Sequence, residues 1–240
     1  MPMRFNNLII SGLLFSFSLL LRLPFTSKLL YHWDSVQFAL AIKDYNVVLH
    51  QPQPPGYILY VLLGRGANFF IHNANSALIA LSIIFGAAAV VIVFQLGQLM
   101  FGKSAGLLAA ALFIFSPTVW FYSEIALSDL PDAFMATSLA FFCYKGITES
   151  NKAFLYSLLA AAALGLSGGI RQPTLILLLP LLGFTLWYSA KGRGTIIISA
   201  AIAVLTLTTA SWLIPMLILT GGLSQYLMAL GDLAHRIGWL

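Results

Sequence analysis

The stretch SALIALSIIFGAAAVVIVFQLGQLM, residues 76–100, decides the class of fold because it carries no charged side chain. As a helix rising about 1.5 Å per residue it would be about 38 Å long, more than the roughly 30 Å apolar core of a bilayer. A helix also pairs its backbone groups within one segment, as lipid surroundings require. This stretch therefore predicts a membrane-spanning helix.

The rest of the chain has the same character. It is 60% hydrophobic and only 8% charged, whereas a soluble domain carries about 25% charged residues. A membrane β-barrel would show short alternating segments instead of long apolar runs. The fold class predicted is an all-α integral membrane protein with about seven spans. The predicted spans are residues 7–23, 76–100, 105–122, 131–147, 153–169, 173–190 and 195–219.

One further apolar run, residues 55–71, is predicted to lie at the membrane interface without spanning. It opens with Pro54-Pro55-Gly56 and carries Arg65 well inside it. An arginine near the bilayer centre costs about 2.5–3.5 kcal/mol on insertion scales. The first extracytoplasmic loop is therefore expected to contain interfacial helices.

The charges support this topology. We place the N-terminus in the cytoplasm and do not count 55–71 as a span. The whole formal net charge of +5 then falls on the cytoplasmic side, as the positive-inside rule expects. The cytoplasmic charges are then Arg4, Lys103, Lys145, Lys152, Lys191, Arg193 and Glu149. Since topology accounts for the charge and no basic cluster exists, a nucleic-acid partner is not expected. We predict a domain of residues 1–220 and an amphipathic extracytoplasmic tail of residues 221–240. The tail carries no stop signal, which leaves open that the chain is a fragment of a longer one.

Polar groups gather in the predicted outer loops. Asp34 lies in an aromatic frame with Trp33, which an interfacial aromatic belt would also explain. Glu124, Asp129 and Asp132 form an acidic second loop, where helix capping and compensation of the helix dipole are the simpler interpretations. Because both loops fall on one side, we expect their carboxylates to meet.

Cations accompany these acids on the same side. Arg65, Lys43 and Arg171 are candidate ligands for a phosphate, which suits the planar fork of a guanidinium. Snorkelling to the interface is the alternative for Arg171. His50 is a candidate binding residue in the first loop, and no histidine spacing resembles a metal motif.

The order of these motifs resembles the GT-C class of membrane glycosyltransferases. The motifs that carry the resemblance are Trp33-Asp34-Ser35, Gln53-Pro54-Pro55-Gly56-Tyr57 and Leu127-Ser128-Asp129-Leu130-Pro131. The branch that it resembles most is the protein O-mannosyltransferase and aminoarabinose-transferase-like group, also called glycosyltransferase family 39. This chain differs in having Gln53 where members often have histidine, and in being shorter.

The resemblance implies a hexosyl- or pentosyltransferase that uses a polyprenyl-phosphate sugar. The acceptor would be a lipid, a glycan or a protein, and membrane lipids would surround the enzyme. Asp34 would activate the acceptor hydroxyl and Asp129 would be the second catalytic acid. Arg65, Arg171, Lys43, Glu124, Asp132 and His50 would bind donor phosphate or acceptor.

The expected mechanism is an inverting displacement at the extracytoplasmic face of the membrane. The membrane expected is a bacterial inner membrane. A monophosphate leaving group can be held by cationic side chains, so no cofactor is required, although a divalent cation would also be compatible. Two other classes stay open. The protein could be a transporter or flippase for a lipid-linked or anionic solute, or a non-catalytic or truncated membrane partner.

Overall fold

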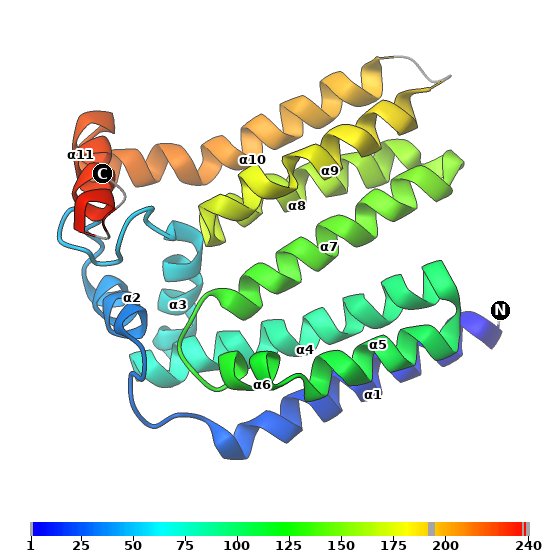
Figure 1. Ribbon diagram of the computed structural model, residues 1–240, viewed down its shortest axis with the longest axis horizontal. Helices are drawn as coiled ribbons and strands as arrows, with labels where there is room; N and C mark the ends of the chain where they lie inside the picture. The colour runs from blue at the N-terminus through cyan, green and yellow to red at the C-terminus, as the bar shows by residue number, and fades with distance from the viewer. Residues whose placement is uncertain (1, 192–194, 237, 239–240) are drawn as a thin grey trace.

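The protein is a bundle of helices with a cap of short helices at one end (Figure 1). This computed structural model describes residues 2–191, 195–236 and 238, with side chains described from Asn6 onward, so Arg193 lies outside the described residues. The long helices are α1 (Pro2–Arg22), α4 (Ala74–Phe101), α5 (Lys103–Phe115), α7 (Asp129–Thr148), α8 (Ala153–Ile170), α9 (Gln172–Ala190) and α10 (Ile196–Thr220). The shorter elements are the helices α2 (Trp33–Lys43), α3 (Ile58–Ile71), α6 (Pro117–Ser123) and α11 (Leu223–Arg236), with 3₁₀ turns at Leu23–Phe25 and Ser150–Lys152. The predicted all-α fold is confirmed.

The number of spans is lower than the seven predicted. In the described part of the chain, 5 helices are long and apolar enough to cross a membrane, or up to 6 if the bent pair α5–α6 is one span. The remaining prediction, 131–147, corresponds to α7, which does not meet the same criterion. The reason is polarity, because α7 has Asp129 and Asp132 in its first turn and Lys145 in its last. Helix α7 nevertheless packs against both α4 and α8, and Figure 1 draws it between them.

The predicted span 105–122 is broken in the middle. Pro117 begins α6 at an angle of 58° to α5, and Ser116 before it is extended, as residues before proline prefer. The break frees carbonyl groups of α5 from helical pairing. Arg22, fully buried at the end of α1, donates from Nη2 to the Ile114 carbonyl at 3.0 Å and from Nε to Ser123 Oγ at 2.9 Å. The buried arginine therefore joins α1 to both halves of the broken span.

Helices α8 and α10 approach closely through small residues. A Cβ added to Gly165 would collide with the Thr208 side chain, and one added to Gly169 would lie 2.5 Å from Leu59 and 2.9 Å from Trp212. The Trp212 indole donates to the Gly165 carbonyl at 2.7 Å. Close backbone approach at small residues is typical of membrane helix packing.

The predicted outer loops meet at the capped end of the bundle. Ser27 N donates to the Glu124 carbonyl at 2.9 Å, and Asn75 Nδ2 donates to the Ser27 carbonyl at 2.9 Å. The α4–α5 and α7–α8 connections lie at the opposite end, as Figure 1 shows. Helix α3, in the run predicted to be interfacial, is too short to span at about 21 Å. Of the predicted tail, α11 is described, and residues 237, 239 and 240 lie outside the described residues.

Candidate functional site

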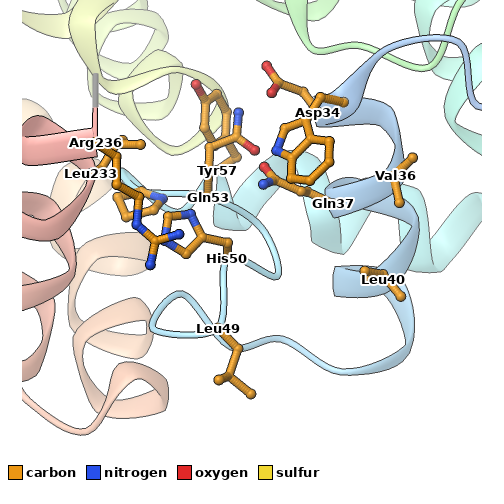
Figure 2. A pocket seen from close by; sticks show the side chains of 12 residues that line it. Asp34, Val36, Gln37, Leu40, Leu49, His50, Gln53, Tyr57, Leu233 and Arg236 are labelled. Atoms are coloured by element: carbon orange, nitrogen blue, oxygen red, sulfur yellow. The ribbon is translucent and has the colours of Figure 1, made fainter. Parts of the chain in front are cut away.

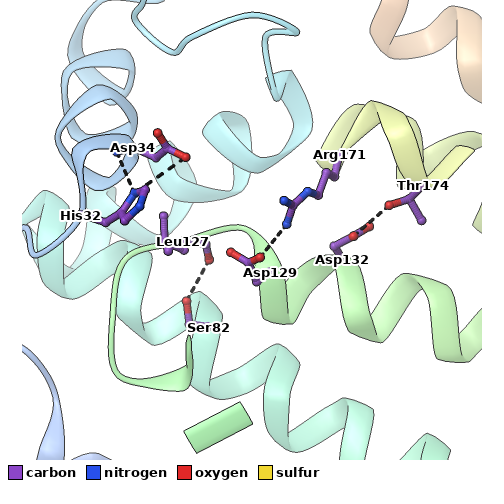
Figure 3. A network of polar contacts seen from close by, with 8 residues as sticks. All are labelled: His32, Asp34, Ser82, Leu127, Asp129, Asp132, Arg171 and Thr174. Atoms are coloured by element: carbon purple, nitrogen blue, oxygen red, sulfur yellow. Dashed lines mark hydrogen bonds and ion pairs between the residues drawn. The ribbon is translucent and has the colours of Figure 1, made fainter. Parts of the chain in front are cut away.

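Asp34 lies in the first turn of α2 and lines a cavity of about 680 Å³ at the capped end. Its backbone N–H donates to His32 Nδ1 at 3.1 Å, so His32 caps the helix. The same ring nitrogen lies 3.8 Å from Asp34 Oδ2 (Figure 3). The carboxylate is one-third exposed and has no cation bound to it among the described residues.

The cavity lies between α2 and α11. Figure 2 shows Asp34 and Gln37 on one side and Arg236, from α11, near His50 on the other. Gln53 and Tyr57 of the connecting loop complete the polar lining. Side chains that can accept or donate hydrogen bonds thus line the same cavity as the carboxylate.

The Pro-Pro-Gly-Tyr element is held by a small hydrogen-bond network. Tyr45 Oη donates to the Gly56 carbonyl at 2.7 Å, and Gln172 Nε2 donates to the Pro55 carbonyl at 2.9 Å. Tyr226 of α11 donates to Gln172 Oε1 at 2.9 Å. Gly56 has φ +109°, and a Cβ there would lie 2.8 Å from Met216 Sδ, so glycine is required. The network fixes the loop against α9 and α11.

The second acidic loop is fixed by Ser82 of α4. Its hydroxyl lies 3.0 Å from the Leu127 carbonyl (Figure 3) and 2.9 Å from the Ile125 carbonyl. Both of these loop residues are buried. The loop is therefore packed rather than mobile at the surface. It delivers Asp129 to the bundle end in a defined position.

Asp129 forms an ion pair with Arg171. Arg171 Nη1 lies 2.6 Å from Asp129 Oδ1, and the two side chains are 38% and 29% exposed. The alternative interpretation of Asp129 as a helix cap does not fit the structure, because Asp129 is the first residue of α7 and the residue at the cap position is Ser128. One turn further, Thr174 Oγ1 donates to Asp132 Oδ2 at 2.8 Å. Two contacts thus join the start of α7 to the start of α9.

Tyr57 lines the same cavity as Asp34. Burial raises the pKa of its hydroxyl, Arg171 lowers it, and the charges of Asp34, Asp129 and Asp132 raise it further. The charges of both acidic segments and of Arg171 therefore act on this hydroxyl. Sequence reasoning did not single out Tyr57 as a site residue, although its place beside the Pro-Pro-Gly turn was a usable signal.

A comparison with protein families now decides the assignment. The family model for dolichyl-phosphate-mannose-protein mannosyltransferases matches residues 54–219. The chain belongs to this family. No curated protein and no solved structure matches it.

Membership of the mannosyltransferase family makes the chain a membrane glycosyltransferase of the GT-C type. The match includes Tyr57, Asp129 and Arg171. It begins after Asp34 and His50 and ends before α11. The cavity around Asp34 is therefore lined mainly by segments that flank the matched region.

Three other predicted site residues of this mannosyltransferase-family chain, Arg65, Lys43 and Glu124, do not line the Asp34 cavity. Arg65 donates from Nε to the Ile42 carbonyl and from Nη2 to the Ala41 carbonyl, both at 3.0 Å, and so closes the end of α2. Lys43 lines a separate hollow on the outer side of α2. Burial raises the pKa of Glu124, which faces Trp120 and Arg22.

His50 is the exception, since it lines the Asp34 cavity, where its Nε2 lies 3.8 Å from Asp232 Oδ2. Within the described residues, no three His, Cys, Asp or Glu side chains are grouped as metal ligands.

Proposed function

We propose that this chain transfers a sugar from a polyprenyl-phosphate donor to an acceptor hydroxyl at the extracytoplasmic face, with inversion at the anomeric carbon. The observation that carries the proposal is that one end of the bundle holds two differently paired charged groups. Asp34, with no lysine or arginine paired to it among the described residues, lines a cavity with Tyr57, and the Arg171 guanidinium is held by Asp129 at the same end (Figure 3). These are the base and the phosphate ligand that such a displacement needs.

An apolar groove supports a lipid-linked donor. It lies between α3, α4, α7 and α8, has a volume of about 540 Å³, and is lined by side chains such as Leu62, Leu63 and Phe85. Leu59 and Ile170 also line it, and Ile170 is followed directly by Arg171. A polyprenyl chain in this groove would place its phosphate at Arg171.

Arg171 is the phosphate ligand of the proposal. A guanidinium has five N–H donors, and the bond to Asp129 uses one of them. Asp129 is in this view a positioning residue that keeps the guanidinium aimed at the bundle end. Arg65 is not assigned this role, because its guanidinium already binds two carbonyls of α2.

The reaction follows from these positions. The acceptor oxygen attacks the anomeric carbon while the bond from that carbon to the phosphate oxygen breaks, and polyprenyl phosphate leaves. Asp34 takes the proton of the acceptor hydroxyl. Negative charge grows on the leaving phosphate, so Arg171 stabilises the transition state more than the ground state. The scheme requires no metal ion.

An extracytoplasmic site is supported by charge. The capped end holds acids and bases in equal number, whereas the opposite end holds an excess of lysines, the bias expected for a cytoplasmic surface. His50, Gln53 and Arg236 would contact the acceptor in the cavity.

The test is Asp34→Asn in membranes supplied with a radiolabelled polyprenyl-phosphate sugar. We expect transfer to fall about 10²–10⁴-fold, the usual loss on removing a general base. Asp44→Asn is the matched control, because Asp44 is exposed just past the other end of α2 and should keep full activity. Transfer by Asp34→Asn within a factor of about three of the control would refute the assignment.

A further inference from the structure

A second polar hollow lies at the opposite end of the bundle from the proposed active site. It has a volume of about 630 Å³ and is walled by α1, α4, α7 and the start of α8. We call it the distal pocket, defined by Asn7, Ser11, Gln95, Gln98, Lys145, Glu149, Lys152 and Tyr156 with Leu8, Leu99 and Phe141. The glycosyl transfer proposed above uses none of these residues.

Each wall presents its polar side chains at helical spacing. Asn7 and Ser11 are four residues apart on α1, and Gln95 and Gln98 are three apart on α4, so each pair shares a face. Gln95 lies about 9 Å before the end of α4, and its Nε2 donates to Ser11 Oγ of α1 at 3.4 Å. The two helix faces thus turn their polar groups toward each other across the pocket.

The cationic centre of the pocket is Lys145. Its ammonium donates to Tyr156 Oη at 3.0 Å, lies 3.0 Å from Glu149 Oε1, and lies 4.8 Å from the centre of the Tyr156 ring. These contacts use two of its three N–H donors and fix its position. One donor is left for a ligand.

Lys152 supplies a second cation. Its side chain is exposed and makes no hydrogen bond or ion pair with any other described residue. With Lys145 and Glu149 it gives the pocket a net charge of +1. An anion bound there would also meet the amide donors of Asn7 and Gln98.

The rim of the pocket is apolar. Leu8 is 71% exposed and Leu99 is 43% exposed, and each lies next to a pocket amide, Asn7 or Gln98. On helices that span a membrane, exposed leucines contact acyl chains. The ligand that matches this rim has a polar anionic head and an apolar tail.

We propose that the distal pocket binds the phosphate headgroup of an anionic phospholipid, with Lys145 and Lys152 as its cations. Basic pockets between spanning helices are known to hold such headgroups. The shared chemistry is a phosphate ester, which a soluble phosphate could also provide.

The experiment measures lipid binding to the full chain, purified in a neutral detergent, by native mass spectrometry. The probes are phosphatidylglycerol, zwitterionic phosphatidylcholine, and glycerol phosphate as the soluble anion. We expect phosphatidylglycerol to bind at least tenfold more tightly than phosphatidylcholine. Each lysine removed should weaken it about fivefold, so Lys145→Gln/Lys152→Gln should lose about 25-fold.

The matched control is Lys103→Gln/Lys191→Gln, which removes two exposed lysines from the same end outside the pocket. It should bind phosphatidylglycerol like the native chain. Lys152→Gln alone tests the site without disturbing the contacts of Lys145. Equal binding of the two lipids, or equal losses in pocket and control variants, would overturn the proposal. Displacement by glycerol phosphate at concentrations comparable to the lipid would overturn the lipid assignment in favour of a soluble phosphate.

Discussion

The ion pair between Arg171 and Asp129 gives the sharpest test of how the site is built. We consider Arg171→Gln, Asp129→Asn and the double variant. Arg171→Gln leaves the Asp129 carboxylate without its cation and with Asp132 three residues away on the same face of α7. Asp129→Asn leaves a guanidinium that is more than one-third exposed and can still be hydrated.

The size of the effect follows from geometry and exposure. A hydrogen bond to a charged group contributes about 1.5–3 kcal/mol, whereas a fully exposed ion pair contributes about 0.2–1 kcal/mol. The 2.6 Å contact with side chains 38% and 29% exposed lies between these cases. We therefore expect about 2 kcal/mol lost for Arg171→Gln, about 1 kcal/mol for Asp129→Asn, and a coupling energy of about 1–1.5 kcal/mol.

The assay is thermal unfolding in one detergent at one scan rate, since membrane proteins often unfold irreversibly. At about 2–4 °C per kcal/mol, Arg171→Gln should lower Tm by about 4–8 °C and Asp129→Asn by about 2–4 °C. The double variant should resemble Arg171→Gln rather than the sum of both. Raising the salt concentration should reduce the coupling.

The control is Arg236→Gln, which breaks a more exposed pair, with Arg236 Nη2 2.9 Å from Asp232 Oδ2. It should shift Tm by less than about 2 °C. If the effects of Arg171→Gln and Asp129→Asn simply add, the two side chains do not interact in the folded protein. Arg171 would then no longer be a held phosphate ligand.

Gly106→Ala should destabilise the fold by about 1–3 kcal/mol, because its Cβ would lie 2.6 Å from a backbone oxygen of α4. Gly183→Ala is the control, because open space surrounds Gly183 and the variant should melt like the native chain. Equal melting temperatures of the two variants would contradict the close packing of α5 on α4. Burial raises the pKa of Glu124, so its ionised form is disfavoured in the folded protein, and stability should fall as pH rises from about 4.3 through the raised value. Glu124→Gln should therefore melt higher than the native chain near neutral pH, with the difference vanishing in acid, and an unchanged difference across the pH series would count against this. Lys28→Cys should react with a membrane-impermeant maleimide on intact cells and Lys103→Cys should not, whereas labelling of Lys103→Cys would reverse the proposed topology.

The class of fold follows from the local composition of the chain. Runs such as 76–100 leave no alternative to a membrane helix, because lipid requires each segment to pair its own backbone groups. The same local logic predicted that 55–71 is not a span, and α3 is too short to be one. The prediction of a span at 131–147 is not met by the same measure of length and apolarity. Its acids and its lysine lie at the ends of helix α7, which packs between α4 and α8.

The sequence by itself also predicted that Asp34 and the acidic second loop belong to one side of the membrane, since spans alternate in direction and 55–71 is not counted as one. What it could not determine was the partner of each charge. Arg65 and Arg171 are equally plausible phosphate ligands by composition. Only the packing of α3 on α2 commits Arg65 to two backbone carbonyls, and only the packing of α8 and α9 on α7 brings Arg171 to Asp129 across 42 positions. Such pairings depend on how rigid helices cross, which no stretch of sequence encodes locally.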